Sequence, residues 1–547
     1  MKVTLLAISM MVATIAQAGT VTLDGFHLTQ DQAWRVAQGK DDVEIAPEAM
    51  DRLKKAHELV MQAAKSGAPV YGLTVGVGLN KDKSLFDAKG ELSKEVLQAS
   101  KEFNRNALRS HDAGVGDMMD DELTRLTLLI RLNTLLAGQT GAQPHVAEIY
   151  KDFLNKNVLP QIPSRGSVGE ADITLSSHVG AVMMGEWKAK ANGKVVSGKE
   201  ALKSAGIKPL DPEGKDALAI LSTNSAAVAQ VMKAAKSAEQ IINVTPEVFA
   251  LSLEGLNGNV APVLPQSIKV HPVKGLEEEA AKIRDALKGS YLWESHPERA
   301  LQDPLSFRTS VYTMREARKA LKDLNDEILV QINSSDDNPG TILNSDKDYA
   351  DKSQVAKYFV KGDKVSGAII PTANFEPLAV ALAAQNLSTS LAHLSHNSVM
   401  RTLHLSDDHF TGLPRFLTAP GNKGHAFGAI QKPFVALHSE NIALTSPVSM
   451  LGVPVAGDIE DTYTNLPFVA QRLGNIADNM ANIYSLELLH SAQAIDLRKK
   501  LKGDFAMGEA TKKLYDAYRQ KVPFVPADRI YTDNIKDGKQ LIENYKD

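Results

Sequence analysis

The sequence contains no cysteine among its 547 residues. This absence excludes disulfide bonds, thiolate catalysis and zinc sites built on cysteine. No run of about 18 apolar residues predicts a membrane-spanning helix. The net charge is −4 and no large basic block occurs, which argues against nucleic acid as the main partner. The histidines are scattered without a metal-ligand spacing, so we predict no metal site.

Residues 1–18 have the pattern of a secretory signal peptide. Lys2 supplies a positive start, residues 3–16 form a short apolar segment, and Ala16-Gln17-Ala18 is typical of a cleavage site. A buried N-terminal helix is the alternative interpretation. An exported chain without cysteine has no thiol to misoxidise. We therefore expect a periplasmic protein.

The apolar patterning predicts a mainly α protein built on a bundle of long helices. Hydrophobic residues make up 43% of the chain, as in globular proteins. We predict helices over residues 47–64, 91–109, 121–137, 215–243, 309–330, 378–396 and 471–498. Several are apolar on more than one face, which favours packing against other subunits. We expect a loop-rich active-site portion (19–215) and a helical portion (216–547) in one continuous unit.

The segment 165–178 combines two glycines with several ionisable side chains. Its two glycines predict a tight backbone with positive φ or close approach. Glu170, Asp172 and His178 follow, and the apolar residues 179–184 predict a buried helix. We expect these polar side chains to point toward one place. A simple turn before an N-capped helix is the alternative.

A second glycine-bearing loop covers residues 71–78, Tyr-Gly-Leu-Thr-Val-Gly-Val-Gly. A phosphate-binding loop, a structural turn and a flexible loop carrying one reactive phenol are all compatible with this pattern. The first is the weakest, because no strand–helix frame or P-loop lysine follows at the required spacing.

Taken together, the loops resemble the histidine and aromatic amino acid ammonia-lyase family from Tyr71 to Arg498. The segments that carry the resemblance, in the family's order, include Tyr71-Gly-Leu-Thr, Ser110-His111, Leu129-Ile-Arg-Leu-Asn, Gly166-Ser-Val-Gly, Gln302-Asp-Pro with Arg308, Ser335-Asp-Asp-Asn-Pro, Asn374-Phe, Gly412-Leu-Pro, Ser439-Glu-Asn and Leu486-Glu-Leu-Leu-His. The resemblance implies a largely helical fold, a homotetramer and active sites shared between subunits.

The sequence departs from the family directly after Gly169. Family members carry Ala-Ser-Gly there, and this tripeptide cyclises into the electrophile methylidene-imidazolone (MIO). Here Glu170-Ala171 take its place, and Asp172 matches the family's next aspartate, with one residue fewer between them. Because the serine and the glycine nitrogen are missing, we predict an enzyme without MIO or any other cofactor.

A lyase without this electrophile needs a substrate whose nitrogen leaves unaided. A quaternary ammonium has no N–H proton and departs as a neutral amine. The chain therefore resembles the MIO-free branch of the family, which eliminates trimethylamine from the betaine ergothioneine to give thiourocanate. Alternatives are the same elimination from hercynine or another aromatic betaine, ammonia elimination from histidine, and an inactive homologue that binds betaines or amino acids.

The resemblance assigns a base and a carboxylate-binding group. Tyr71 matches the family's base. A phenol has a pKa of about 10 in water, so it needs a nearby cation, either Lys423 or the substrate's ammonium. Arg308 matches the residue that holds the substrate carboxylate, which a guanidinium binds through two hydrogen bonds; a surface ion pair is the alternative role. Gln302 and Asn374 match residues that orient the same carboxylate.

Other matched positions concern the ring of the substrate. Ser110-His111 resembles the pair of the histidine-specific enzymes and favours an imidazole-derived ring, although His111 is also compatible with a structural role. Glu440 matches a glutamate that lies near the imidazole. Ser222 and Leu305 replace an asparagine and a tyrosine of the family, which fits both a pocket without MIO and an inactive homologue.

The ammonium group needs negative charge without hydrogen bonds. Glu376 stands where the family has histidine, and with Glu170 or Asp172 it would pair with a trimethylammonium. Aromatic faces would add to this attraction. Solvent-facing positions are the alternative for all three carboxylates.

Overall fold

The computed structural model describes residues 19–65, 94–345, 349, 351–362 and 364–546. The predicted signal peptide and Tyr71 lie outside these residues. Both therefore stay predictions.

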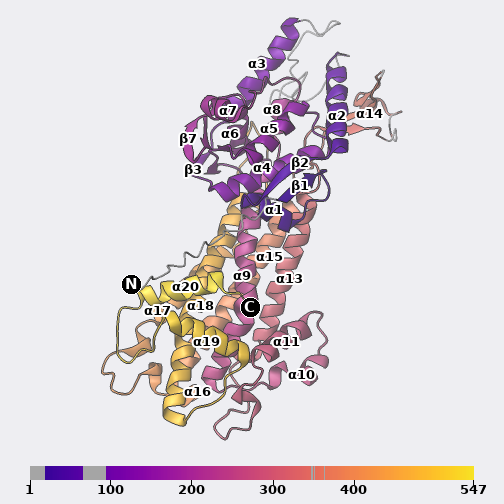
Figure 1. Ribbon diagram of the computed structural model, residues 1–547. Helices are drawn as coiled ribbons and strands as arrows, with labels where there is room; N and C mark the ends of the chain where they lie inside the picture. The colour runs from indigo at the N-terminus through magenta and orange to yellow at the C-terminus, as the bar shows by residue number, and fades with distance from the viewer. Residues whose placement is uncertain (1–18, 66–93, 346–348, 350, 363, 547) are drawn as a thin grey trace, which may run out of the picture.

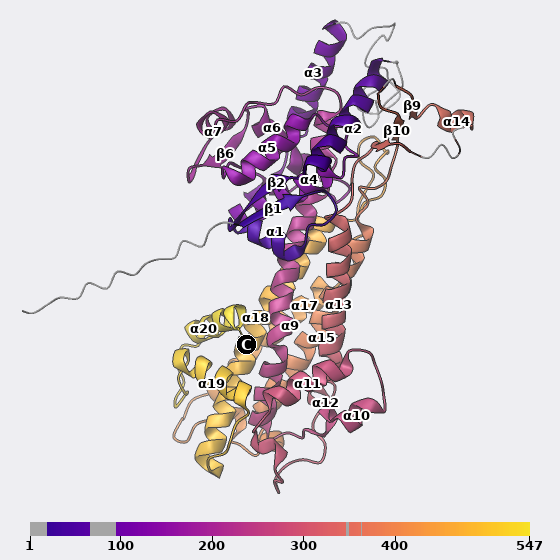
Figure 2. The ribbon, with the colours of Figure 1, turned by 45° about the vertical axis from the view of Figure 1, so that its right-hand side comes forward.

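Four long helices form the body of the molecule: α9 (Ser225–Leu256), α13 (Ser310–Gln331), α15 (Leu378–Leu405) and α18 (Leu466–Lys502). Figures 1 and 2 show them side by side, with α9 packed on α18, α18 on α15 and α15 on α13. α9 and α18 are buried around most of their circumference because apolar and small residues cover several faces of each. The predicted mainly α, long-helix bundle is confirmed.

The loop-rich N-terminal portion caps one end of this bundle, which we call the cavity end (Figure 2). Its helices are α1 (Gln30–Ala37), α2 (Pro47–Lys65), α3 (Lys94–Ser110), α4 (Asp121–Leu136), α5 (Pro144–Asn155), α6 (Ile173–Met183), α7 (Gly198–Ala205) and α8 (Asp216–Leu221). Its strands are β1 (Gly19–Leu23), β2 (Asp41–Ile45), β3 (Val115–Met118), β4 (Leu159–Pro160), β5 (Pro163–Arg165), β6 (Lys188–Ala191) and β7 (Lys194–Ser197). They pair as a parallel β1–β2, and as antiparallel β3–β5 and β4–β6–β7. The predicted helices at 47–64 and 121–137 correspond to α2 and α4.

Short helices surround the other end of the bundle, where α15 finishes; we call this the opposite end (Figure 2). They are α10 (Pro265–Lys269), α11 (Leu276–Ala286), α12 (Leu305–Arg308) and α16 (Asp408–Thr411), with the 3-10 turns η2 (Ala261–Val263), η3 (Tyr291–Trp293), η4 (Arg415–Leu417) and η5 (Ala426–Gly428). Along the sides lie α17 (Gln431–Leu444), α19 (Glu509–Lys521) and α20 (Thr532–Asn544). β8 (Gly340–Leu343), β9 (Phe359–Val360) and β10 (Gly367–Ile370) form a small sheet near α2, with α14 (Ser353–Ala356) between β8 and β9 in sequence.

The helix predicted over residues 215–243 is wrong in its limits. The chain leaves the helical path at Ser222 and returns to it at Ser225, and α9 then continues to Leu256. The break is stabilised from outside, because the Thr223 hydroxyl and the Asn224 N–H both donate to the carboxylate of Asp336, at 2.8 and 2.9 Å. This interruption brings polar groups to the cavity end.

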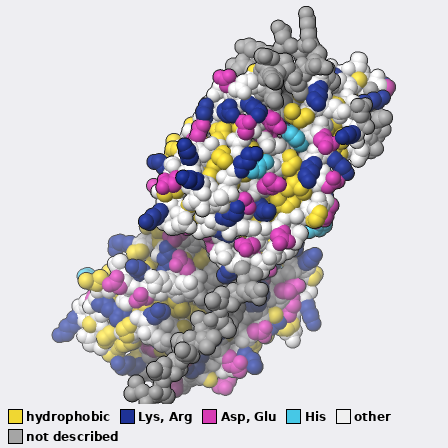
Figure 3. All heavy atoms as spheres, turned by 45° about the horizontal axis from the view of Figure 1, so that its top comes forward, with side chains coloured by type: hydrophobic (Ala, Val, Ile, Leu, Met, Phe, Trp, Pro, Cys, Tyr) yellow, Lys and Arg dark blue, Asp and Glu magenta, His cyan; other side chains and the backbone are white. Residues whose placement is uncertain are grey.

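On the described residues of the face in Figure 3, basic and acidic side chains are interspersed, so this face has no continuous basic patch. No helix of the described part is long and apolar enough to cross a bilayer.

Candidate active site

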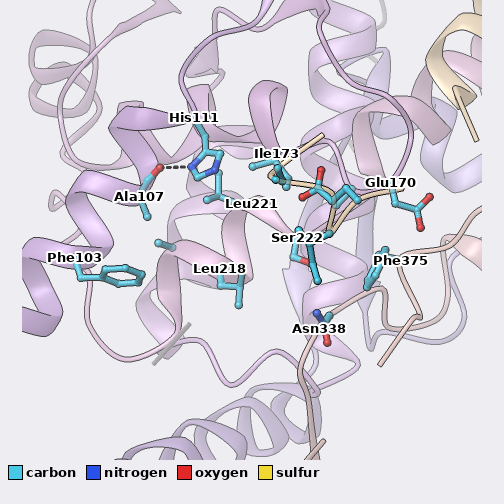
Figure 4. Close-up of a pocket in the computed structure, with 16 residues that line it drawn as sticks. Phe103, Ala107, His111, Glu170, Ile173, Leu218, Leu221, Ser222, Asn338 and Phe375 are labelled. Carbon is cyan, nitrogen blue, oxygen red and sulfur yellow. Dashed lines mark hydrogen bonds between the residues drawn. The ribbon is translucent and has the colours of Figure 1, made fainter. Parts of the chain in front are cut away.

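A cavity of about 560 Å³ opens at the cavity end, between α3, the loop before α6, α8 and the loop before α18. Apolar side chains form one side, including Phe103, Leu218 and Leu221, and carboxyl groups lie on the other (Figure 4). The lining residues are Phe103, Ala107, His111, Glu170, Ala171, Ile173, Ala217, Leu218, Leu221, Ser222, Asn338, Phe375, Ala456, Gly457, Ile459 and Glu460. None of these described residues is Lys or Arg.

The glycine loop before α6 enters this cavity in a conformation that its sequence predicts. Gly166 and Gly169 have φ of +120° and +79°, as expected. A Cβ at Gly169 would lie 2.4 Å from the backbone nitrogen of Leu466, so no side chain fits there. Ala171 also has positive φ, +74°, which is uncommon for a residue with a side chain.

Asn224 holds this strained backbone in place. Its side-chain oxygen accepts the N–H of Ala171 at 3.0 Å, and its side-chain nitrogen donates to the carbonyl of Phe375. One fully buried amide thus joins the break before α9, the loop before α6 and the loop before α15. Sequence reasoning singled out Ser222 and missed Asn224. The signal was a polar run inside an apolar helical pattern.

A buried ion network fixes the position of Asn224, whose backbone N–H donates to Asp336. Arg131 of α4 contacts the carboxylates of Asp336 and Asp337 at 2.8 and 3.0 Å. All three side chains are essentially inaccessible to solvent. Removing one member of such a network leaves an uncompensated buried charge. Two of the segments that carry the family resemblance, the one around Arg131 and the one around Asp336, therefore meet here. They support the cavity and do not line it with these side chains.

Three carboxyl groups come together beside Ala171. Glu170 and Glu460 line the cavity, and Glu376 shares a side-chain hydrogen bond with Glu170. Burial, this hydrogen bond and the charges of Glu376 and Glu460 raise the pKa of Glu170 to about 8. The sequence predicts that Glu376 acts on a trimethylammonium together with Glu170 or Asp172, and in the structure Glu376 lies beside Glu170. Glu460, in the loop before α18, was not predicted, because no motif marks it.

Asp172 lies behind the cavity wall. It is fully buried, accepts the Ser167 hydroxyl at 2.7 Å and the Ala227 N–H at 2.8 Å, and does not line the cavity. Burial raises its pKa to about 6. Nearby, His178 pairs with Asp112 at 2.8 Å. The polar side chains of segment 165–178 therefore do not converge, which makes that expectation wrong.

His111 lines the cavity with a defined orientation (Figure 4). Its Nδ1 lies 2.7 Å from the carbonyl oxygen of Ala107, to which it donates. In the neutral ring this bond leaves Nε2 as an acceptor. The Ser177 hydroxyl fixes the backbone by donating to the carbonyl of His111 at 2.9 Å. Ser110 is exposed, bonds back to Ala107 at 3.2 Å and does not line the cavity.

Two of the predicted carboxylate-binding residues, Arg308 and Gln302, lie at the opposite end. In α12, Ser306 contacts His404, the penultimate residue of α15, at 3.4 Å. α15 has 28 residues, so at about 1.5 Å per residue it separates Arg308 from Glu376 by roughly 40 Å. Arg308 is half-buried and has no ion pair with the described residues. Gln302 and Leu305 are exposed beside it.

The remaining predicted residues are dispersed. Lys423 is exposed in a loop near the end of α18, where Asp528 accepts the backbone N–H groups of His425 and Ala426. Asn374 is exposed in the loop before α15, and Glu440 is exposed on α17. One chain thus brings Glu170, Ala171, Glu376 and His111 to the cavity end, with Asn374 in the loop of Glu376. Among the described residues, Gln302, Arg308, Lys423 and Glu440 do not line the cavity. No three side chains of the described part are arranged to hold a metal ion.

Comparison with known proteins places the chain in a family. Residues 28–520 match the aromatic amino acid lyase family. The chain therefore belongs to this family, as its motifs predict, and the predicted class, a carbon–nitrogen lyase, agrees with that membership.

Individual relatives carry more specific names. The crystal structure of the ergothioneine-degrading enzyme ergothionase from Treponema denticola, bound to desmethyl-ergothioneine sulfonic acid, is similar with a TM-score of 0.86 and 37% identity, covering 96% of this chain and 98% of that one. Histidine ammonia-lyase from Vibrio cholerae is 30% identical over 94% of this chain and 95% of its own length. Tyrosine aminomutase from Streptomyces globisporus has a TM-score of 0.81 at 26% identity, covering 96% and 97%.

Proposed function

We propose that this protein eliminates trimethylamine from ergothioneine to give thiourocanate, without an MIO electrophile. The observation that carries the proposal is the replacement of the electrophile-forming residues by Glu170-Ala171 in the wall of an anionic cavity. A cavity lined by carboxyl groups without a described Lys or Arg suits a cationic ligand. The similarity to Treponema ergothionase supports the same substrate.

The residues of the loop before α6 argue against formation of an MIO electrophile. MIO formation requires a glycine nitrogen that attacks a carbonyl and a serine that loses water. Ala171 and its neighbours supply neither, and the Ala171 N–H is already bonded to Asn224. The substrate nitrogen must then leave without capture, which a trimethylammonium does.

The proposed reaction is a proton abstraction coupled to C–N cleavage. Tyr71 removes the proton from the carbon next to the ring, the new double bond forms, and the C–N electron pair leaves with trimethylamine. The Nε2 of His111 accepts an N–H of the imidazole-derived ring. The carboxyl groups at Glu170, Glu376 and Glu460 hold the ammonium by charge alone.

The substrate carboxylate requires a second copy of the chain. Arg308 is roughly 40 Å from the cavity along α15, so within one chain it cannot reach a ligand bound beside Glu170. We propose a homotetramer in which Arg308, Gln302 and Lys423 of one subunit complete the cavity of another. The exposure of Asn374 and Glu440 in the single chain is consistent with such an assembly.

The assay follows the two products. Purified protein is incubated with ergothioneine, hercynine or histidine, while thiourocanate absorbance, trimethylamine and ammonia are measured. We expect trimethylamine and thiourocanate from ergothioneine. Trimethylamine from hercynine alone would change the assigned ring, and binding of every betaine without turnover would indicate an inactive homologue.

A variant tests the base. Tyr71→Phe removes the phenolic oxygen and keeps the ring, so turnover should fall by about 10²-fold or more, whereas ergothioneine binding should stay close to that of the wild type. Normal turnover would show that Tyr71 is not the base.

Ammonia elimination from histidine is the second candidate. The 30% identity to Vibrio cholerae histidine ammonia-lyase and the Ser110-His111 pair favour it. Ammonia release from histidine in the same assay would support this candidate and contradict a mechanism that depends on a quaternary nitrogen.

We also propose that residues 1–18 direct the protein to the periplasm. Cell fractionation with an antibody to the mature chain tests this, and the expected N-terminal residue of the exported protein is Gly19.

A further inference from the structure

Three loops that are distant in sequence bring carboxyl groups together at the cavity. Glu170, before α6, and Glu460, before α18, line it, and Glu376, before α15, interacts with Glu170 from beside it. Glu376 lines an adjoining cavity of about 280 Å³, together with Asp461. The hydrogen bond between Glu170 and Glu376 has a chemical requirement. Two ionised carboxylates are both acceptors, so they share a hydrogen bond only when one of them carries a proton.

We propose that this pair binds the substrate's quaternary ammonium by exchanging a proton for it. In the empty site Glu170 and Glu376 hold one proton between them, and when the ammonium arrives that proton leaves for solvent. The inference rests on the proposed function, because it takes the ammonium of a betaine as the occupant of this wall.

The charge balance of the empty wall explains why it retains a proton. Glu170, Glu376 and Glu460 repel one another when all are ionised, and the Glu170 Oε2 is buried without a hydrogen-bond partner among the described residues. Burial and these like charges raise the pKa of Glu170 to about 8, above neutral pH. An ammonium beside the pair replaces the positive charge that the proton supplies.

The other ionisable groups around the pair set the limits of this exchange. His111, the residue after α3, is the remaining titratable side chain among the described residues that line the cavity with Glu170 and Glu460. From the loop before α18 comes Asp461, in the adjoining cavity. Behind the wall, Asp172 is occupied by Ser167 and Ala227. None of the described cavity-lining residues supplies a permanent positive charge in place of the proton.

Proton exchange gives the wall a means to select quaternary nitrogen. An amino acid ammonium carries its own N–H donors, so it can hydrogen-bond to a carboxylate beside a retained proton. A trimethylammonium has no N–H and interacts by charge alone, which makes the ionised pair the better partner. Binding of a quaternary ligand should therefore depend more steeply on pH than binding of a primary amine.

Calorimetry measures this exchange directly. Tetramethylammonium chloride is titrated into the full-length protein at pH 7 in buffers of different ionisation enthalpy, and ergothioneine is titrated into the Tyr71→Phe protein in the same way. The buffer dependence of the heat gives the number of protons released. From a pKa of about 8, we expect about 0.9 proton per site at pH 7, and an affinity that rises nearly tenfold from pH 6 to pH 7 and levels above pH 9.

Amide variants identify the source of the proton. Glu170→Gln can still donate to Glu376 but cannot titrate, so proton release should fall close to zero and the affinity should become almost independent of pH. Glu376→Gln should behave alike and serves as the second variant if the first does not fold. Asp461→Asn, which changes a carboxyl group in the adjoining cavity, is the matched control and should release as many protons as the wild type.

The results separate this inference from the proposed function. Binding of tetramethylammonium without proton release, no binding of it at all, or undiminished release from Glu170→Gln would overturn the inference, even if ergothioneine is turned over. Conversely, proton release with tetramethylammonium supports the inference, and failure to form trimethylamine from any betaine would then contradict only the proposed function.

Discussion

The two ends of the helical bundle present side chains of opposite charge. The cavity end presents the carboxyl groups Glu170, Glu376 and Glu460, and the opposite end presents Arg308 and Lys423. A betaine has one positive and one negative group only a few bonds apart. Under the proposed function, subunit packing has to create the complete site, because a single chain holds Arg308 roughly 40 Å from Glu376.

The two ends also differ in how firmly their side chains are held. At the cavity end, Arg131, Asp336 and Asn224 fix the loop that bears Glu170 through buried hydrogen bonds. At the opposite end, Arg308 lies in a four-residue helix and has no ion pair with the described residues. Each chain therefore holds a preorganised pocket of carboxyl groups, and we propose that Arg308 gains its partner only on assembly and substrate binding.

The largest expected effect is functional complementation between two impaired chains. Glu170→Lys changes the cavity end and Arg308→Ala changes the opposite end. Each variant alone should lose about 10²–10³-fold in kcat/KM, because each leaves one charge of the substrate without a partner. Coexpressed with different affinity tags and purified through both, mixed tetramers should regain about one quarter of wild-type activity, the share of sites that combine two intact ends by random assembly.

The control is a mixture of two variants that are both altered at the cavity end. Glu170→Lys mixed with Glu460→Lys alters the cavity end of every chain, so activity should stay at the level of the single variants. If the cross-end mixture also shows no recovery, the two ends do not belong to one shared site.

A smaller effect is expected from Asn224→Ala, which tests the rigidity of the cavity end. The substitution leaves the Ala171 N–H and the Phe375 carbonyl without their partner. Unsatisfied buried groups cost about 1–3 kcal/mol, so the free energy of unfolding should fall by this amount, and kcat/KM should fall by about tenfold or more as Glu170 loses its position.

Denaturant unfolding and steady-state kinetics measure the two quantities. Asn482→Ala is the control, because its side chain bonds to Asp478 within α18 and touches no part of the cavity. If Asn224→Ala matched this control in both measurements, Asn224 would not hold the loop.

Sequence reasoning reached the fold because helix patterning is local. α4, α13, α15 and α18 follow apolar periodicity, which a single segment displays by itself. The interruption at Ser222 was missed because it depends on Asp336, more than a hundred residues away. Local patterns do not report such a distant partner.

The sequence pointed to cavity residues where a motif departed from its family, and missed residues whose contacts are purely tertiary. The substitution at Glu170-Ala171 lies in the cavity wall, and Glu376, predicted to act with Glu170 or Asp172 on the ammonium, lies beside Glu170. Glu460 was missed because its loop has no distinctive residues. Asp172 was assigned to the ammonium from proximity in sequence, although backbone direction turns its side chain into the core.

The smallest effect is a pH-dependent gain in thermal stability from Glu170→Gln. Burial raises the folded-state pKa of Glu170 from 4.5 to about 8. Between these values the folded protein binds more protons than the unfolded chain, so stability falls as pH rises through that window. Glutamine never ionises and removes this penalty. Because Glu170 is only half-buried, the ligand-free melting temperature should rise by about 1–2 °C at pH 9 and not at pH 4.5.

The control for this experiment is a glutamate at the opposite end. Glu278 is exposed on α11 at the opposite end, and Glu278→Gln should leave the melting temperature unchanged at both pH values. Thermal melts across pH 4.5–9 measure the difference. An equal gain for Glu170→Gln at both extremes would mean that packing of the amide is responsible, and that ionisation of Glu170 carries no cost in the folded state.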